Sequence, residues 1–355
     1  MISSMHIIGS QHSGGAERFF IRLVDGIAAT GNPVLTICRK SSSVARDLPC
    51  TIEQAHVPMK NFLDVWSRWR ISRIVKKLEP HIVQTYMGRA TRLTHVPKTS
   101  GAVHIARLGG FYKLAGYRHA HAWIGNTKAV CDYLVDNGFP RDRVFYIRNF
   151  VEPASGYNVD ELANLRKKYG IPVEAKLLVA VGRLVEKKGF QDLLKAFSGL
   201  PADIGGAPLY LMVVGDGPMA RQLKIQAVSE GVADRVVWPG WQAQPDPFYA
   251  LADIFVCPSR HEPLGNVILE AWSHSKAVCS TLTHGARELI EHEKNGILVP
   301  CEDTGKMTEA LRQMLLASES SIRALGDQGF HEIINNFSRD SVVNEYLELY
   351  RKLLG

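Results

Sequence analysis

Two segments of the sequence carry charged side chains in places where a diphosphate could bind. In the first, an apolar run ends at Gly182, and Arg183 and Lys188 follow it before a helix predicted from about Gln191. A guanidinium and an ammonium beside the amino end of a helix suit a bound anion, because the free N–H groups there add partial positive charge. A solvent-exposed basic turn is the alternative, and this segment alone does not decide between the two.

The second segment follows the apolar run Ile254–Cys257. Glu262 lies in the loop, and Glu270 lies about one turn into a helix predicted to begin near Leu264 or Gly265. The first N–H groups of such a helix can meet phosphate or sugar oxygens. A carboxylate at Glu270 can accept from two vicinal hydroxyls, as a ribose offers. An exposed helical glutamate is the alternative, but its apolar neighbours predict burial, and a buried carboxylate needs a partner.

Short apolar runs alternate with helical patterns along the whole chain, which predicts parallel sheets covered by helices on both faces. The strands predicted in the first half are Met5–Gly9, Val34–Cys38, His81–Thr85, Val103–Ala106, Trp123–Gly125 and Val144–Ile147. The strands predicted in the second half are Leu177–Val181, Leu209–Val214, Val236–Trp238, Ile254–Cys257, Ala277–Ser280 and Ile297–Val299. The pattern pauses at residues 152–156, where we expect a linker. The sequence therefore predicts an α/β protein of two Rossmann-like, doubly wound domains that face each other across a cleft.

The motifs, taken in this order, resemble those of the retaining glycosyltransferases of family 4, which have the GT-B fold. The resemblance covers essentially the whole chain. It rests on Gly14-Gly15-Ala16-Glu17 after the first strand, the Asn149 turn, Gly182-Arg183-Leu184 with Lys188-Gly189, Val214-Gly215-Asp216-Gly217-Pro218, and Pro258-Ser259 with Glu262 and Glu270.

The resemblance implies three catalytic residues. Arg183 and Lys188 would hold the diphosphate of a nucleotide-sugar donor and stabilise the charge on the leaving phosphate, and Glu262 would contact the transferred sugar. It implies that the donor-binding residues are Gly15, Gly182, Gly215, Gly217, Leu264, Gly265, Asn266 and Glu270, with Glu270 on the ribose. It also implies an acceptor-side domain over residues 1–155, a donor domain over 156–338, and a helix over 339–355 that returns to the first domain.

The sequence departs from the family pattern at several positions. Leu264, Ser275 and Ala277 stand where the family often has Phe, Gly and Pro. Many relatives carry a histidine in the cleft of the first domain, for which His104 and Arg107 are the candidates here. Strand alternation predicts that His104 is packed and that Arg107 faces the cleft. Arg89 is a further candidate on the acceptor side.

The charge is unevenly distributed. Residues 1–150 carry 21 Lys and Arg against 9 Asp and Glu, a net charge of +12, whereas the rest of the chain carries −5. This asymmetry favours an anionic partner, such as a membrane surface or a phosphorylated acceptor, over the alternative of a solvated basic face. Phe62, Trp66 and Trp69 lie among five cations and predict contact with anionic lipid. Farther along the same stretch, Ile71, Ile74, Val75 and Leu78 have the spacing of a core-facing helix.

Some features of the sequence also fit functions other than sugar transfer. Gly215–Ala220 with Asp234 fits a loose dinucleotide fingerprint and supports an NAD-dependent oxidoreductase, but that function leaves both cations and both glutamates without a role. A nucleotide-sugar epimerase on the same fold and a binding protein without turnover stay open. We expect no nucleic-acid partner, because helix-turn-helix, RNP and zinc spacings are absent from the sequence.

The sequence also lacks Asp-x-Asp, HExxH and CxxC, so we expect no metal and no cofactor, the nucleotide sugar being a substrate. No secretory signal or bilayer-spanning stretch is evident in it, which favours the cytoplasm, at the inner face of its membrane. The expected function is transfer of a hexosyl-type sugar from a UDP- or GDP-sugar to a glycan or glycolipid acceptor in bacterial surface polysaccharide or lipopolysaccharide synthesis.

Overall fold

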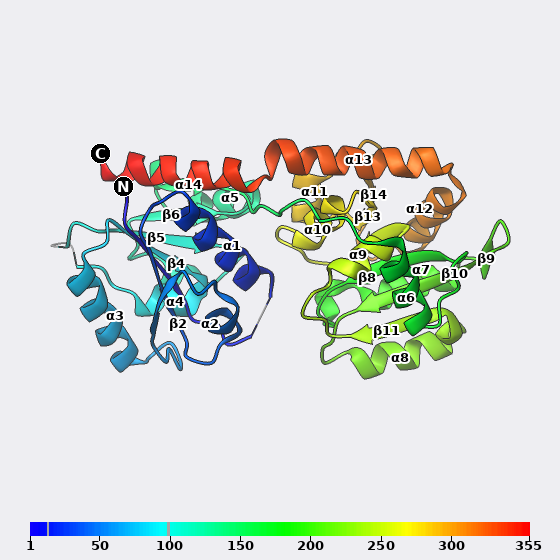
Figure 1. The fold of residues 1–355 in the computed structure, drawn as a ribbon, viewed down its shortest axis with the longest axis horizontal. Helices are drawn as coiled ribbons and strands as arrows, with labels where there is room; N and C mark the ends of the chain where they lie inside the picture. Colours follow the sequence, from blue (N-terminus) through cyan, green and yellow to red (C-terminus); the bar gives the residue numbers. More distant parts are fainter. Residues whose placement is uncertain (13, 98–99) are drawn as a thin grey trace. The chain divides into compact units, whose positions relative to one another are not determined.

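The computed structural model describes residues 1–12, 14–97 and 100–355. They form two compact units (Figure 1). Unit 1 comprises Met1–Phe150 and Phe337–Gly355, and unit 2 comprises Val151–Asn336. Ser13, which the sequence places in the first glycine-rich loop, lies outside the described residues. Each unit contains a parallel sheet with helices packed on it, so the predicted class of two α/β domains is confirmed.

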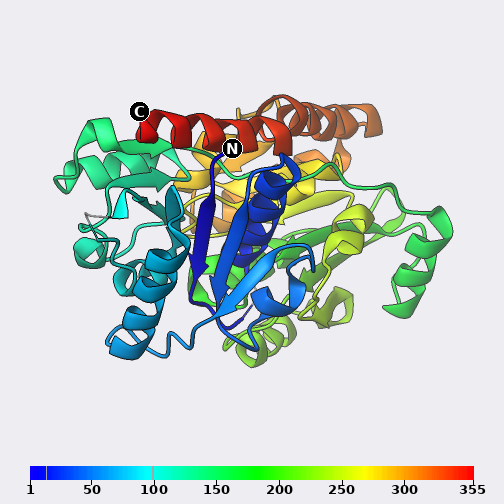
Figure 2. The ribbon, with the colours of Figure 1, turned by 60° about the vertical axis from the view of Figure 1, so that its left-hand side comes forward.

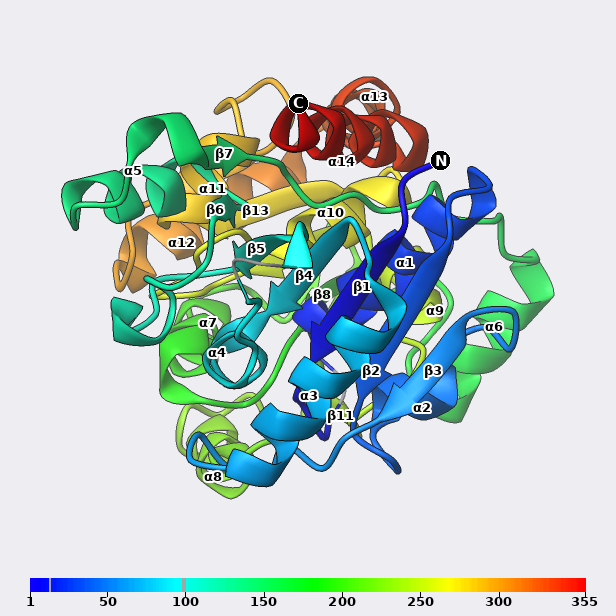
Figure 3. The same cartoon turned by 90° about the vertical axis from the view of Figure 1, so that its left-hand side faces the viewer.

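The sheet of unit 1 has the strand order β3-β2-β1-β4-β5-β6-β7, and all its pairings are parallel. Figure 3 looks onto this unit, with β3, β2, β1 and β4 following one another across the sheet. The strands are β1 (Ser4–Ile8), β2 (Val34–Cys38), β3 (Glu53–His56), β4 (Ile82–Tyr86), β5 (Val103–Leu108), β6 (Ala122–Gly125) and β7 (Val144–Tyr146). Every residue of β1 is buried, because helices cover both faces of a doubly wound sheet.

The helices of unit 1 have apolar stripes that pack on this sheet. They are α1 (Gly15–Ala29), α2 (Ser43–Asp47), α3 (Val65–Leu78), α4 (Met87–Leu93), α5 (Lys128–Asp136) and α14 (Arg339–Leu354), with short 3₁₀ turns at Leu114–Gly116 and Arg141–Arg143. In α1 the apolar stripe that includes Leu23 and Ile27 is buried. The helix begins at Gly15, and Gly31 with φ +79° follows its end.

The C-terminal helix α14 belongs to unit 1, where it lies beside α1 (Figures 1 and 2). Gly26 of α1 allows this close packing, because an added Cβ would lie 2.7 Å from Val343 of α14. An ion pair of 2.7 Å between Arg339 and Asp25 joins the same two helices. Tyr346 and Tyr350 are fully buried, so α14 is part of the core of unit 1.

The sheet of unit 2 has the strand order β11-β10-β8-β12-β13-β14, with the short β9 paired antiparallel to β10. The strands are β8 (Lys176–Val181), β9 (Asp203–Ile204), β10 (Ala207–Val214), β11 (Val236–Gly240), β12 (Ile254–Cys257), β13 (Ala277–Thr281) and β14 (Ile297–Val299). The helices are α6 (Val159–Lys168), α7 (Phe190–Ser198), α8 (Ala220–Ser229), α9 (Asp246–Leu251), α10 (Asn266–Ser273), α11 (His284–Leu289), α12 (Thr304–Leu316) and α13 (Glu319–Asn336), with 3₁₀ turns at Glu186–Lys188 and Ala233–Arg235.

The strand order of unit 2 decides which loops meet. Strands β10, β8 and β12 are neighbours and run parallel, so the loops that follow them lie at the same edge of the sheet. These are the loops that begin at Gly215, Gly182 and Pro258. The fold therefore brings together three segments that the sequence separates by more than thirty residues.

Candidate active site

The loops after β8 and β12 pack against each other through their backbones. Gly189 has φ +66° and comes directly before α7, and an added Cβ would overlap the carbonyl group of Pro258. The amide N–H groups of Arg260 and His261 both donate to the carbonyl oxygen of Lys187, at 2.9 and 3.1 Å. Glycine at position 189 thus meets two demands, a left-handed conformation and a close backbone approach.

The loop after β10 approaches the β8 loop equally closely. A Cβ on Gly215, which has φ +146°, would overlap the carbonyl of Gly182, and a Cβ on Gly217 would overlap the backbone of Leu184. The amide of Leu184 donates to the carbonyl oxygen of Asp216 at 2.9 Å. The three glycines predicted to bind the donor therefore hold these loops together, whatever else they contact.

Lys188 and Glu262 lie at the centre of this edge and form an ion pair, with Lys188 Nζ donating to Glu262 Oε2. Their side chains are only 19% and 15% exposed. Burial opposes the charge on Lys188, but the Glu262 carboxylate outweighs it and raises the pKa of the ammonium. The buried thiol of Cys257, at the end of β12, also lies near Lys188. The structure thus brings two of the three predicted catalytic residues into contact.

Arg183 and Arg260 differ in the hydrogen bonds and ion pairs that their guanidinium groups make. Arg183 is exposed, and within the part of the chain that the structure describes its guanidinium makes no hydrogen bond or ion pair. Arg260 donates through Nε and Nη2 to the two oxygens of Asp192, at 2.7 Å each, and is thereby fixed on α7. Of these two arginines, Arg183 is therefore the one whose donors face no carboxylate.

Helix α10 begins at Asn266, one or two residues later than predicted, after Gly265 with φ +86°. The N-cap residue is Gly265, which has no side chain to cap the helix. The preceding backbone is held by the start of α11: the amide of Gly285 donates to the carbonyl oxygen of Glu262 at 3.0 Å, and a Cβ on Gly285 would overlap Leu264. The first N–H groups of a helix are suited to anionic or hydroxyl oxygens.

Glu270 is 8% exposed, so its predicted burial is confirmed. Its partner is Tyr249 of α9, whose hydroxyl donates to Glu270 Oε2 at 2.6 Å. This partner was missed, because an aromatic residue in a short apolar helix is usually part of the core. A carboxylate has several acceptor sites, and the Tyr249 hydroxyl occupies one of them.

Arg107, which we predicted to face the cleft, is buried within unit 1. It is 4% exposed, its guanidinium donates to Tyr346 Oη at 2.8 Å and to Asn149 Oδ1, and it stacks on the Phe19 ring at 4.1 Å from the centroid. The reason is that the C-terminal helix α14 covers this end of β5. Arg107 therefore anchors α14, and a contact with an acceptor stays a prediction.

The other candidates of unit 1 lie in different surroundings. His104 is buried, as predicted, at 3.1 Å from the Thr85 hydroxyl, and burial holds its pKa well below the usual value. Arg89 donates to the carbonyl oxygens of Gly9 and Met59, at 3.1 and 3.3 Å, and ties the loop after β1 to α4. Gly15 is the first residue of α1, rather than a loop residue.

The three aromatic residues predicted to contact lipid, Phe62, Trp66 and Trp69, are each about half exposed. They lie on α3 and the turn before it. Ile71 and Val75, on the opposite stripe of α3, are fully buried. Leu78, the last residue of the helix, is 47% exposed, so its predicted place in that stripe is wrong.

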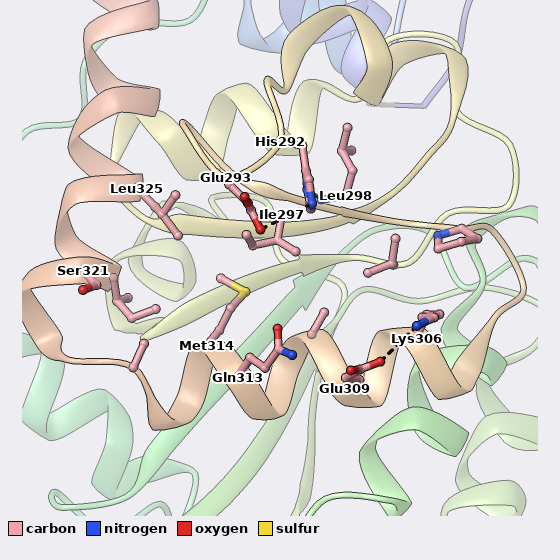
Figure 4. Close-up of a pocket in the computed structure, with 15 residues that line it drawn as sticks. His292, Glu293, Ile297, Leu298, Lys306, Glu309, Gln313, Met314, Ser321 and Leu325 are labelled. Atoms are coloured by element: carbon pink, nitrogen blue, oxygen red, sulfur yellow. Dashed lines mark hydrogen bonds and ion pairs between the residues drawn. The ribbon is translucent and has the colours of Figure 1, made fainter.

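A further pocket, with a volume of about 370 Å³, runs along β14 between α12 and the start of α13 (Figure 4). It contains none of the predicted site residues. Among residues 1–12, 14–97 and 100–355, no three His, Cys, Asp or Glu side chains gather as a metal-binding group. None of the described helices has both the length and the apolar character that crossing a bilayer requires.

Comparison with known proteins matches both units. Residues 13–155 match the family described as Glycosyltransferase Family 4, and residues 163–329 match Glycosyl transferases group 1. The lipopolysaccharide core biosynthesis glycosyltransferase LpsE of Rhizobium meliloti is 32% identical over 95% of both chains. LpsD of the same organism is 30% identical over 98% of this chain and 97% of its own.

Solved structures agree with this assignment at the level of the fold. The Anabaena protein HepE in complex with UDP-glucose superposes with a TM-score of 0.87 over 99% of this chain and all of its own, at 16% identity. WaaG, a glycosyltransferase involved in lipopolysaccharide biosynthesis, gives 0.76 over 98% and 99%, at 19% identity. Both halves of the chain, its two parallel sheets and its full-length relatives lead to one conclusion: this protein belongs to glycosyltransferase family 4 and has the GT-B fold.

Proposed function

We propose that this protein transfers a hexosyl-type sugar, with retention of its anomeric configuration, from a UDP- or GDP-sugar to a glycolipid acceptor in the synthesis of a lipopolysaccharide core. The acceptor class is supported by the roles of LpsE and LpsD in lipopolysaccharide core biosynthesis, because this chain resembles both over nearly its full length. The donor class is supported by the family assignment and by the cationic edge of the unit 2 sheet.

The observation that carries the proposal is the Lys188–Glu262 pair between the loops of two adjacent parallel strands. In the reaction the bond between the anomeric carbon and the diphosphate oxygen breaks, and the departing oxygen keeps the electron pair. An acceptor hydroxyl bonds to the anomeric carbon, and its proton passes to the departing diphosphate. Lys188, Arg183 and the first N–H groups of α10 would stabilise the new negative charge, and Glu262 would shift from the ammonium alone to a shared contact with the sugar.

The nucleotide would be held through its ribose. Glu270 is held by Tyr249, and a carboxylate can accept from the two neighbouring hydroxyls of a ribose. The buried position of this carboxylate would make each hydrogen bond to it strong, because water competes poorly there.

The proposed reaction needs no metal, because two side-chain cations supply the charge that a divalent ion provides elsewhere. Turnover should therefore be the same with EDTA as with added Mg²⁺ or Mn²⁺. Loss of activity with EDTA and its recovery with one of these ions would contradict this part of the proposal.

Incubation with a panel of UDP- and GDP-sugars and a truncated lipopolysaccharide acceptor tests the function. Acceptor-dependent release of UDP or GDP, with a product heavier by one sugar, is the expected result. An isomerised donor without transfer would indicate an epimerase, and tight donor binding without either reaction would indicate a binding protein. Retention is checked by the anomeric proton coupling of the product.

We also propose a peripheral contact between unit 1 and the inner face of the cytoplasmic membrane through Phe62, Trp66 and Trp69. Arg70 and Arg73 lie over the two indole rings, at 5.3 Å from each centroid, so cations and aromatic surface are presented together. Trp66→Ala/Trp69→Ala should co-sediment less with anionic vesicles than the parent protein. Equal co-sedimentation would remove the proposed contact.

A further inference from the structure

A second cationic site lies in unit 1, outside the residues assigned to sugar transfer. It is a cavity of about 420 Å³ between the start of α3, the end of α4 and the 3₁₀ turn at Leu114–Gly116. The polar and aromatic residues that line it are Phe62, Asp64, Arg68, Arg92, His95 and His119.

Arg92 has two contacts that use none of its hydrogen-bond donors. Its guanidinium lies over the Phe62 ring, at 5.1 Å from the centroid. On the other side it lies against Gly116, where an added Cβ would be 2.9 Å from Arg92 Nε. Within the described residues, no carboxylate pairs with Arg92 and no carbonyl accepts from it. Its donors are therefore available to a ligand in the cavity.

The second guanidinium of the cavity, Arg68, is also exposed and has no carboxylate partner among the described residues. The acid in the lining, Asp64, is committed to its own helix. It accepts from the amide of Ser67 at 3.0 Å, from the Ser67 hydroxyl at 2.7 Å and from the amide of Lys60 at 2.9 Å. The cavity thus carries an excess of positive charge that its single carboxylate does not neutralise.

Two stacked imidazoles form the inner wall. The rings of His95 and His119 are 4.2 Å apart, and His119 Nε2 donates to the carbonyl oxygens of Thr91 and Thr94. Burial is the largest cause that lowers the pKa of His95, and the nearby His119 and Arg68 lower it further, to about 4. The imidazole is therefore neutral at pH 7 and reports the positive potential of its surroundings, which a bound anion would reduce.

The rim of the cavity is apolar and turned to solvent. Leu63 and Val65 are 85% and 75% exposed, and Trp66 follows on the same helix. A cationic cavity bordered by exposed aliphatic and aromatic side chains matches the two ends of one kind of molecule, an anionic lipid. A free phosphate would meet the guanidinium groups but would leave the apolar rim in water.

We propose that this cavity binds the phosphate of an anionic phospholipid headgroup, with Arg68 and Arg92 donating to its oxygens and Leu63 and Val65 entering the lipid interface. The proposal rests on the membrane contact of α3 proposed above and gives it a specific headgroup site. Charge-assisted, bidentate contacts from Arg92 would add selectivity for phosphate to a general attraction between a basic surface and an anionic bilayer.

The test compares two arginines of equal charge. Arg92→Gln removes the guanidinium in the cavity, and Arg70→Gln removes one that also stacks on an exposed aromatic ring but does not line the cavity. Binding is measured with vesicles of phosphatidylcholine containing phosphatidylglycerol. Arg70→Gln should weaken vesicle binding about fivefold, the effect expected from loss of one surface charge. Arg92→Gln should weaken it by a further factor of about ten, since it also removes charge-assisted hydrogen bonds. Equal losses in the two variants would overturn the headgroup site.

A second readout is the His95 ring in NMR spectra of the histidine-labelled protein, which also shows that each variant is folded. Phosphatidylglycerol vesicles should shift the His95 signals in the parent and in Arg70→Gln, but not in Arg92→Gln. A shift with glycerol phosphate, and no binding to vesicles, would assign the cavity to a soluble phosphate ester and overturn the lipid proposal. These measurements use no nucleotide sugar, so their failure is distinct from a failure of the proposed transfer reaction.

Discussion

The ammonium of Lys188 is ion-paired with the carboxylate of Glu262, 74 residues farther along the chain. Each residue lies in the loop after a buried strand, and the two strands, β8 and β12, are hydrogen-bonded neighbours. The pair is mostly shielded from water, so its charges interact more strongly than those of a surface pair. The fold thus holds one cation and one carboxylate side by side at the edge where the loops of β8 and β12 meet.

The close approach of the β8 and β12 loops can be tested with two glycines. Gly189→Ala should destabilise unit 2 and lower activity, because a methyl group there overlaps the Pro258 carbonyl. Gly170 has φ +68°, against +66° for Gly189, but an added Cβ would meet nothing within 4 Å. Gly170→Ala should therefore cost only the strain of a left-handed alanine, about 1 kcal/mol. Thermal unfolding of both variants is the measurement, and equal losses of stability would contradict the account.

The hydrogen bond between Tyr249 and Glu270 should matter for nucleotide binding. Tyr249→Phe leaves a buried carboxylate with one donor fewer, which we expect to destabilise unit 2 by about 1–3 kcal/mol and to weaken binding of UDP or GDP. Tyr210→Phe is the matched control. Tyr210 is half-buried in β10, and its hydroxyl makes no hydrogen bond to the described residues. Calorimetric titration with the nucleotide checks this. Unchanged affinity in Tyr249→Phe would separate Glu270 from the ribose.

The stability of unit 1 should fall in mild acid because of His6. This residue is fully buried between Tyr86 Oη, at 2.9 Å, and Ser4 Oγ, at 3.1 Å, and burial lowers its pKa from 6.5 to about 3. Between these two values only the unfolded chain binds the proton. Above pH 6.5, His6 therefore leaves the free energy of unfolding unchanged. Below pH 6.5, it lowers this free energy by about 1 kcal/mol per pH unit as the pH falls toward 3.

Amide hydrogen exchange of β1 as a function of pH checks this prediction. His6→Gln should show a shallower slope than the parent, whereas His56→Gln, which changes an exposed histidine, should keep the parent's slope. His95 and His104 add to the same trend, because burial lowers the pKa of both. A slope unaffected by the change at position 6 would show that His6 takes up its proton in the folded state.

The elements that the sequence predicted best are strands that consist of a largely apolar run. The bounds predicted for β2, β12 and β14 agree with the structure. Strand β3 was missed because its residues, Glu53–His56, include a single apolar side chain and lie at the sheet edge, where burial imposes no apolar pattern. Local pattern thus reveals strands with an apolar run, including the edge strand β14, and overlooks an edge strand that lacks one.

The site was predicted to the extent that its residues lie beside strand ends in the sequence. Lys188 and Glu262 each follow an apolar run, and the burial of Glu270 could be inferred from its neighbours. The partners of Arg107 could not, because Tyr346 is 239 residues away and only the packing of α14 brings it near. The cavity around Arg92 was likewise invisible, since three separate segments of unit 1 form it.

The central claim is that the Lys188 ammonium stabilises the charge of the leaving diphosphate, and the turnover of Lys188→Ala tests it most directly. Lys187→Ala is the control, because Lys187 is an exposed neighbour with the same charge. With saturating donor and acceptor, we predict that kcat of Lys188→Ala falls by about 100- to 1000-fold while the protein stays folded, and that Lys187→Ala stays within about twofold of the parent. A folded Lys188→Ala protein with near-parental kcat would contradict the account.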